Sequence, residues 1–174
     1  AAFLSATFGG LPRNAAPWTL PVAVAGAAGK TIVVKKPVPQ SSIMYAHEGF
    51  KRDDPDFFAA FLVNHILGGG SFTSRLYQNI REKRGLVYSI SSYLHPMDWA
   101  GLVAGSGGTA NARVGETVTL LREEWNRIAK DGITKTELSE AKTFQTGSFP
   151  LRFTSSGRIA GMLVWMQLFI VNLQ

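Results

Sequence analysis

The residues in this chain most able to bind a metal ion are three histidines, His47, His65 and His95. A zinc site on a helix needs two histidines on one face with a glutamate beside them, as in H-x-x-E-H. The pair His47–Glu48 has no second histidine in the following turn, and His65 has no Glu or His within one turn. The pattern therefore predicts three unrelated histidines and no zinc site owned by this chain alone.

Nucleophilic chemistry has little support in the residue types. The chain contains no cysteine, which excludes a thiol nucleophile, a disulfide scaffold and a zinc ribbon. Serines are frequent, but none lies in the G-x-S-x-G elbow of a serine hydrolase. A serine triad is recognised by geometry rather than by order, and no local pattern here favours one.

Two glycine-rich segments resemble phosphate-binding loops in form. Gly105–Ala110 matches G-x-G-x-x-A, and Gly68–Ser71 is G-G-G-S without the Lys-Ser/Thr ending of a P-loop. The first segment follows the second arm of a predicted hairpin rather than the first strand of a βαβ unit. We therefore interpret Gly105–Ala110 as a strand-to-helix turn and expect no dinucleotide cofactor.

The chain is moderately basic, with 18 Lys and Arg against 12 Asp and Glu, a formal net charge of +6. The densest basic run contains Arg75, Arg81, Lys83 and Arg84. Such a charge suits anionic partners, but no nucleic-acid-binding motif surrounds the run. A solvated helix face explains it more simply, and we expect no nucleic-acid partner.

The segment 67–89 carries the densest information, LGGGSFTSRLYQNIREKRGLVYS. It resembles the insulinase/pitrilysin family of zinc peptidases, in the half that lacks zinc. The family pattern there is L-G-G-G, then S-S-R-L, then R-E-K-x-G-L-x-Y-S; Thr73 stands where Ser is common. KPVPQSSI before this segment and GITKTELSEAK after it extend the resemblance over residues 31–165.

The resemblance implies two similar α+β halves that close around a chamber. One half binds zinc through H-x-x-E-H and a distal Glu, so zinc is expected in a partner half and not in this chain. The other half contributes an Arg and a Tyr seven residues apart, which here are Arg81 and Tyr88. Peptide is the implied substrate, and Gly68, Gly69, Gly70 and Ser71 are the implied substrate-contact loop.

The proposed pair has a clear chemical use beside zinc. A guanidinium offers a planar fork of N–H donors and a phenol offers one O–H donor. Zinc-bound hydroxide that attacks a peptide carbonyl develops negative charge on the carbonyl oxygen, which such donors stabilise. Spacing alone favours a simpler interpretation, an Arg on a helix surface and a Tyr on a strand face; the surrounding signature is what favours the functional pair.

The elements that must position these residues follow from local patterns. Strands are predicted over residues 31–36, 41–49, 86–94 and 101–106, and helices over 54–68, 74–83, 112–130, from 134 to Pro150, and from Ser155 or Ser156 onward. Tight turns between neighbouring strands predict antiparallel pairing, so the fold class is α+β, an antiparallel sheet packed against several helices. A turn at Gly85 is expected to fold Arg81 back beside Tyr88.

Several helices have identifiable ends and faces. Asp54 is the expected N-cap of the first, with Pro55 at its first position. Its apolar face is expected from Phe58, Leu62 and Ile66, widened by Phe61. The face of helix 112–130 is expected from Val114, Val118, Leu121, Trp125 and Ile128. The segment Thr134–Glu137 has the spacing of a capping box.

Composition divides the chain into two parts. Residues 1–30, rich in Gly, Pro and Ala, are expected to form an arm from a preceding domain, and residues 31–174 the peptidase-like domain, truncated at its C-terminus. Both ends have the character of a fragment. The apolar stretch 159–173 is shorter than the ~20 residues of a membrane span, which favours a buried core helix.

The resemblance implies that the chain is the substrate-binding, non-zinc half of a metallopeptidase, inactive on its own. Its zinc-bearing partner half would belong to the same polypeptide or to a separate subunit. The alternative is a non-catalytic scaffold or assembly subunit of the same family. The resemblance also implies a bacterial protein, and members in the periplasm or cell envelope are common.

Overall fold

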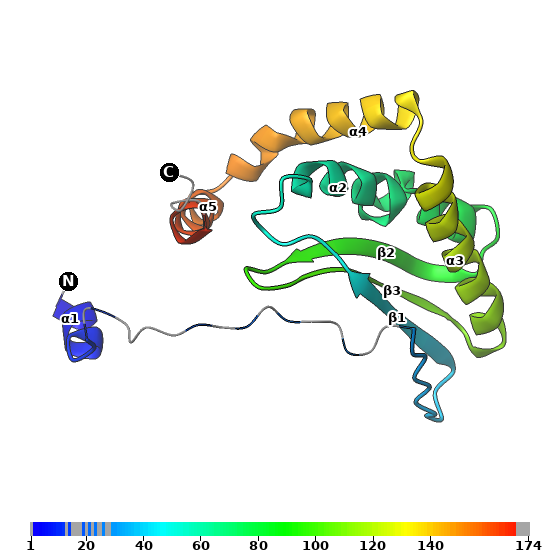
Figure 1. The fold of residues 1–174 in the computed structure, drawn as a ribbon, viewed down its shortest axis with the longest axis horizontal. Helices are drawn as coiled ribbons and strands as arrows, with labels where there is room; N and C mark the ends of the chain where they lie inside the picture. Colours follow the sequence, from blue (N-terminus) through cyan, green and yellow to red (C-terminus); the bar gives the residue numbers. More distant parts are fainter. Residues whose placement is uncertain are drawn as a thin grey trace.

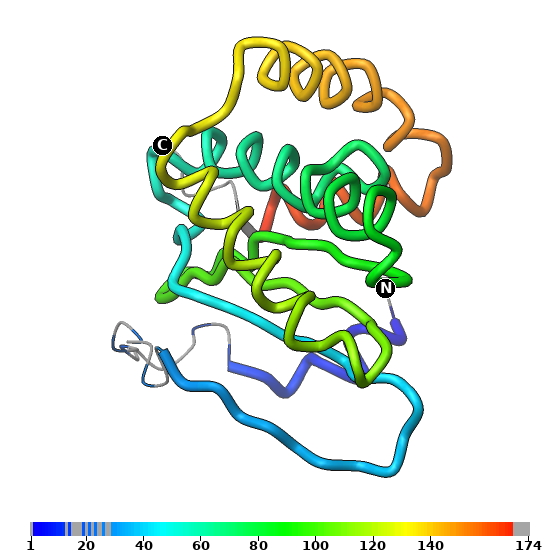
Figure 2. Tube along the Cα trace, turned by 90° about the vertical axis from the view of Figure 1, so that its right-hand side faces the viewer, coloured from blue at the N-terminus to red at the C-terminus, as the bar shows by residue number. Residues whose placement is uncertain are grey.

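The computed structural model describes residues 2–12, 14, 19, 21, 23, 26 and 29–169. Its centre is a three-stranded antiparallel sheet of β1 (Gln40–Glu48), β2 (Val87–Pro96) and β3 (Gly101–Ala110), in the order β1-β3-β2. Helices cover one face of this sheet, and α2 lies between the sheet and α4 (Figures 1 and 2). The α+β class predicted from the sequence is confirmed.

The hairpin of β2 and β3 forms where the sequence predicted it, with longer arms. Its turn runs from Met97 to Ala100, and Met97 N–H donates to the Ala100 carbonyl at 2.9 Å. The segment Gly105–Ala110 continues β3, so the expected strand-to-helix turn over it is wrong. A Cβ at Gly105 would collide with the Tyr45 hydroxyl, which explains a glycine within this strand.

The predicted strand over residues 31–36 is absent from the described structure. Ile32, Val33 and Val34 are strongly exposed there, and β1 pairs with β3 alone among the described strands. β-Branched side chains favour a strand only where a neighbouring ladder is present to pair with them. Within the lead-in, the structure forms a short exposed helix, α1 (Ala2–Phe8).

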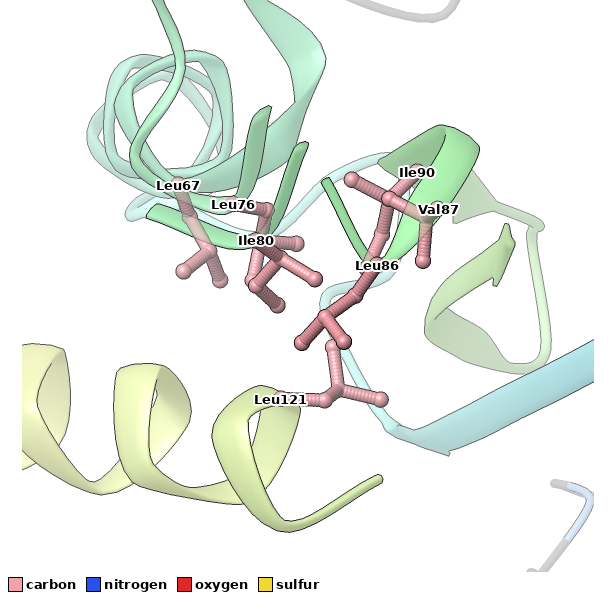
Figure 3. Packing of buried hydrophobic residues seen from close by; sticks show 7 residues of the cluster. All are labelled: Leu67, Leu76, Ile80, Leu86, Val87, Ile90 and Leu121. Atoms are coloured by element: carbon pink, nitrogen blue, oxygen red, sulfur yellow. The ribbon is translucent and has the colours of Figure 1, made fainter. Parts of the chain in front are cut away.

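The hydrophobic core lies between the sheet and the helices. Seven buried side chains form it: Leu67, Leu76, Ile80, Leu86, Val87, Ile90 and Leu121 (Figure 3). Leu76 and Ile80 are completely buried. Both belong to the segment that also carries the candidate Arg81, so the core anchors the helical turn on which that arginine stands.

The first sheet-facing helix differs from its prediction at both ends. α2 spans Phe57–Asn64 with Asp56 as N-cap, while Asp54 instead accepts the Asp56 N–H at 2.9 Å. The helix continues as a π-helical turn, His65–Gly69, in which Ile66 is buried. The predicted face is wrong at Phe58, which is 78% exposed. Because the next five residues are also apolar, the pattern could not select one face.

The later helices follow their local signals more closely. α3 (Val114–Asp131) buries Leu121 and rests Trp125 and Ile128 on the core, as predicted, but it also buries Thr117 and Glu124. α4 (Lys135–Ser148) begins with the predicted capping box. It leads through a 3₁₀ turn, Phe149–Phe153, to α5.

The last described helix, α5 (Ser156–Phe169), begins at a Ser155 side chain that accepts the Arg158 N–H at 3.3 Å. Its apolar side chains are largely exposed, including Leu163 and Leu168, so the expectation of a buried core helix is wrong for its described part. The end of the predicted stretch, residues 170–173, lies outside the described residues. Within the described chain, no helix is both long and apolar enough to span a membrane.

Candidate functional site

Arg81 and Tyr88 are brought together by a turn between a π-helix and a strand. Arg81 lies near the end of the π-helix Tyr77–Glu82. Gly85 then adopts a left-handed φ of +59°, a conformation that glycine reaches without steric cost. The chain reverses there, and the Arg81 Nε–H donates to the backbone carbonyl of Tyr88 at 3.1 Å.

Tyr88 is the extra residue of a β-bulge. Val87 lies opposite Thr109 and Ser89 lies opposite Gly108, so Tyr88 has no partner of its own across the ladder. A bulge redirects side chains and often accompanies active sites. Here it leaves Tyr88 and Ser89 exposed in succession, and the Tyr88 side chain is 70% exposed. The Tyr88 carbonyl is left available to Arg81.

The guanidinium of Arg81 is held on one side and open on the other. Its Nη1 donates to the Tyr77 hydroxyl and to Glu82 Oε1, the latter at 2.7 Å. Its central carbon lies 4.6 Å from the centroid of the Tyr77 ring. No contact of Nη2 is found among the described residues, and the side chain is 38% exposed. Arg81 therefore keeps donors for an external acceptor.

Tyr77 is a site residue that the sequence reasoning missed. It is 7% exposed, and the ring of Phe72 packs edge-on against it with centroids 4.9 Å apart. The signal was present, because Tyr77 and Arg81 are four residues apart on a helical segment, where side chains meet. The three side chains form one stack, which we call the Phe72–Tyr77–Arg81 stack.

The glycine run, Gly68 to Gly70, packs closely against β2 and against the end of the preceding helix. Gly68 is buried, and a Cβ there would come within 2.7 Å of the Ser92 backbone nitrogen. A Cβ at Gly70 would meet the His65 carbonyl oxygen at the same distance. Ser71 has a φ of +51°, unusual for a residue with a side chain. Close packing accounts for all three glycines, since a Cβ at Gly69 would lie 2.8 Å from Asn64 Nδ2, although Gly69 and Ser71 are exposed residues.

Buried polar groups attach this run to its neighbours. The Asn64 side chain exchanges hydrogen bonds with Ser92, accepting from its hydroxyl at 2.7 Å and donating to its carbonyl at 3.3 Å. His65 stacks on Phe144 of α4, and its Nδ1 lies 3.1 Å from Gln145 Nε2. Burial lowers the pKa of His65. Hydrogen bonds and ring packing within the protein therefore hold the glycine run against β2 and α4, and these contacts do not require a ligand.

A second arginine on the same segment, Arg75, is mostly buried and binds through two of its three nitrogens. Arg75 donates from Nε and Nη2 to the two carboxylate oxygens of Glu137, at 2.6 and 2.7 Å, and also to the Gly132 carbonyl at 3.1 Å. The hydrogen bond from Arg75, helped by those from Thr134, lowers the pKa of Glu137 to about 2. Arg75 Nη1 and Glu124 Oε2 are buried without a partner within the described structure. The Arg75–Glu137 ion pair connects α4 to the helical segment that carries Arg75.

The rest of the basic run is also paired. Lys83 donates to the Asn79 side chain at 2.9 Å, and Arg84 donates to the Asn79 carbonyl at 2.8 Å. The histidines lie apart from one another: His47 accepts from Trp125 Nε1 at 2.9 Å, and His65 stacks on Phe144. Among the described residues, no group of three His, Cys, Asp or Glu could hold a metal ion. The site offers hydrogen-bond donors, without a metal-ligand set beside them.

Comparison with known proteins places this chain in a family. Residues 2–144 match the family model described as the peptidase M16 inactive domain. A zinc protease of Streptomyces coelicolor, named as uncharacterized, is 32% identical over 133 residues, which cover 76% of this chain and 29% of that protein. A Helicobacter pylori protein named as a non-peptidase homolog is 31% identical over 115 residues, 65% of this chain and 26% of that protein.

A solved structure has the same fold. The peptidase M16 inactive domain from Pseudomonas fluorescens superposes with a TM-score of 0.71 and 37% sequence identity, over 79% of this chain and 33% of that chain. The chain spans about a third or less of the length of these relatives. The resemblance to the insulinase/pitrilysin zinc peptidases is confirmed, and the chain belongs to this family, the M16 peptidases, as an inactive peptidase domain.

Proposed function

We propose that this chain is the substrate-binding half of an M16 peptidase and works with a zinc-bearing half that carries H-x-x-E-H. The observation that supports this best is the joined pair of Arg81 and Tyr88. A hydrogen bond to the Tyr88 backbone fixes the arginine, while Arg81 Nη2 and the Tyr88 phenol have no partner among the described residues. Two donor groups without a partner among the described residues, Arg81 Nη2 and the Tyr88 phenol, therefore come from the same turn of the chain.

These donors suit the charge that develops during peptide hydrolysis. Zinc in the partner half would supply the nucleophilic hydroxide. As the scissile carbonyl is attacked, its oxygen becomes negative, and donors already in place stabilise it without reorganisation. Arg81 supplies a charged N–H and Tyr88 a neutral O–H, and neither has to leave a buried partner to do so. The loss of one such donor costs on the order of 100- to 1000-fold in rate.

The substrate is proposed to be an extended peptide that passes along the glycine run. The proposed contact is the run Gly68, Gly69, Gly70 and Ser71, in which the exposed Gly69 and Ser71 would meet the peptide and the buried Gly68 would hold the turn. A backbone without bulky side chains lets a peptide approach closely. The domain itself is proposed to comprise residues 31–174, with residues 1–30 as an arm from a preceding domain.

The test is hydrolysis of a quenched fluorescent peptide by the zinc-bearing half, with and without this chain. Activity should require both, and Arg81→Ala or Tyr88→Phe should reduce kcat/KM at least 100-fold. Arg84→Ala is a matched control, since it removes a neighbouring guanidinium whose hydrogen bond goes to a backbone carbonyl away from the site. If the Arg81 and Tyr88 variants match the wild type, the proposal is wrong.

The second candidate is a non-catalytic scaffold or assembly subunit. The Helicobacter pylori relative is named as a non-peptidase homolog, which favours this reading for part of the family. A scaffold would bind its partner half with the same affinity in the Arg81→Ala variant and would add no hydrolysis. Measuring binding and hydrolysis on the same samples separates the two candidates.

A further inference from the structure

The Phe72–Tyr77–Arg81 stack holds one side of the Arg81 guanidinium. We infer that Tyr77 is a positioning residue, which holds the Arg81 guanidinium in the orientation that receives a peptide carbonyl. This inference rests on the proposed function of Arg81. Tyr77 contacts the guanidinium twice, through its hydroxyl, which accepts from Nη1, and through its ring, 4.6 Å from the guanidinium carbon.

Three contacts restrict the Arg81 side chain, which is otherwise very flexible: those with the Tyr77 hydroxyl, the Tyr77 ring and the Tyr88 carbonyl. An arginine loses considerable rotamer freedom when it is fixed, and a binding site gains when that loss has already occurred in folding. Tyr77 and the Tyr88 carbonyl occupy Nη1 and Nε. The planar fork then has one direction left for Nη2, so the donor is aimed before substrate arrives.

Tyr77 is the buried acceptor in this arrangement, and Glu82 is the exposed one. Both accept from Nη1, but the Glu82 side chain is half exposed whereas Tyr77 is buried. Phe72 packs against the Tyr77 ring, and the Phe72 carbonyl in turn accepts from Gln78 Nε2 at 2.6 Å. The orientation of the tyrosine is therefore set by packing, and it transmits that orientation to Arg81.

The π-helical form of this segment supports the same role. The Lys83 N–H donates to the Gln78 carbonyl at 3.1 Å, an i→i+5 bond that widens the turn. Such turns occur frequently at functional sites. Tyr77 opens this turn and Arg81 lies near its end, so both side chains are set by one local irregularity.

The experiment uses the assembled peptidase with its zinc-bearing half and compares Tyr77→Phe with Tyr45→Phe. Each change removes one tyrosine hydroxyl; that of Tyr45 donates to the Ser91 carbonyl, away from Arg81. Tyr77→Phe should lower kcat about tenfold with little change in KM, because it loosens a charged hydrogen bond. Tyr45→Phe should leave both constants unchanged, whatever its effect on the melting temperature.

A double variant decides whether Tyr77 acts through Arg81. In an Arg81→Ala background, Tyr77→Phe should cause no further loss, since the group that it positions is gone. A loss of the same factor with and without Arg81 would overturn the inference, as would Tyr77→Phe and Tyr77→Leu that both match the wild type. If Arg81→Ala itself leaves hydrolysis unchanged, the proposed function fails, which is a separate result.

Discussion

Two arginines six residues apart show how different uses arise from one residue type. Arg75 is 14% exposed at its side chain, and two of its nitrogens bind both oxygens of Glu137. Each guanidinium has one nitrogen without a partner among the described residues, but Arg75 Nη1 is buried, whereas Arg81 Nη2 belongs to a side chain that is 38% exposed. The first guanidinium belongs to the fold, whereas the second remains available to a ligand.

The difference between the two arginines comes from the acceptors that lie within hydrogen-bond distance of each one in the folded chain. The capping box at the start of α4 orients the Glu137 carboxylate, which accepts from Thr134 and from Arg75 together. Among the described residues, the one carboxylate that pairs with Arg81 is that of its chain neighbour Glu82, in a half-exposed pair. Exposed ion pairs are weak, so Arg81 can exchange that contact for a substrate oxygen.

The largest expected effect is a loss of activity at Arg81, where we expect little change in stability. Arg81→Ala should lower kcat/KM of the assembled peptidase by about 100-fold or more, while the free energy of unfolding changes by less than about 1 kcal/mol. Kinetics and urea denaturation on the same preparation would measure both. A loss of stability that accounts for the lost activity would remove the contrast with Arg75.

The converse is expected at Arg75. Arg75→Ala leaves Glu137 without its main partner, in a site where both side chains are mostly buried. Removing one member of such a pair should cost about 2 to 3 kcal/mol in the free energy of unfolding. Urea denaturation measures this, and kcat of the folded fraction should stay near that of the wild type. A fall in kcat comparable with that of Arg81→Ala would contradict the division of roles.

The Arg75–Glu137 pair should also be visible as a dependence of stability on pH. The pKa of Glu137 is lowered from 4.5 to about 2, mainly by the hydrogen bond from Arg75. A lowered carboxyl pKa stabilises the folded chain above pH 4.5, and this stabilisation is lost as pH falls from about 4.5 to 2. We expect a change of about 3 kcal/mol over that window.

Unfolding free energies measured from pH 2 to pH 6 would test this, with Glu137→Gln as the control that cannot titrate. The acid-dependent part should be smaller in the variant. Two parallel curves would mean that another carboxylate is responsible.

The smallest effect is expected at the turn between Arg81 and Tyr88. Gly85 has a positive φ and open space where a Cβ would be, so Gly85→Ala meets only the backbone cost, about 1 kcal/mol. Gly132, whose carbonyl accepts from Arg75, has φ 71° and ψ −151°, which only glycine adopts readily. Gly132→Ala should therefore cost more, about 1 to 3 kcal/mol. Thermal unfolding compares the two, and an equal cost would be unexpected.

The parts of the fold that were predictable rest on local interactions. The capping box of α4 needs only Thr134 and Glu137, three residues apart. The hairpin of β2 and β3 and the core side of α3 follow in the same way from a turn and from helical spacing. The failures needed distant partners: residues 31–36 have strand-like side chains without a ladder, and Phe58 lies on a helix that is apolar all round.

The candidate site divides along the same line. Arg81, Tyr88 and the intervening Gly85 could be selected from the sequence, because the motif and the turn are contiguous. The bulge at Tyr88 could not, since it depends on the register with β3, which pairs Val87 with Thr109 and Ser89 with Gly108. The aromatic support from Tyr77 was within reach of spacing arguments but depends on packing by Phe72.

The sequence by itself determined which donors this protein carries and that a turn returns Arg81 toward Tyr88. It could not determine which of two neighbouring arginines keeps an exposed N–H group without a partner among the described residues. That choice was made in the tertiary structure, because Glu137 is 62 residues from Arg75 and reaches it only when α4 packs against the helical segment. Hydrogen-bond donors are properties of residue types, whereas their availability depends on which acceptors the folded chain brings within 3 Å of them.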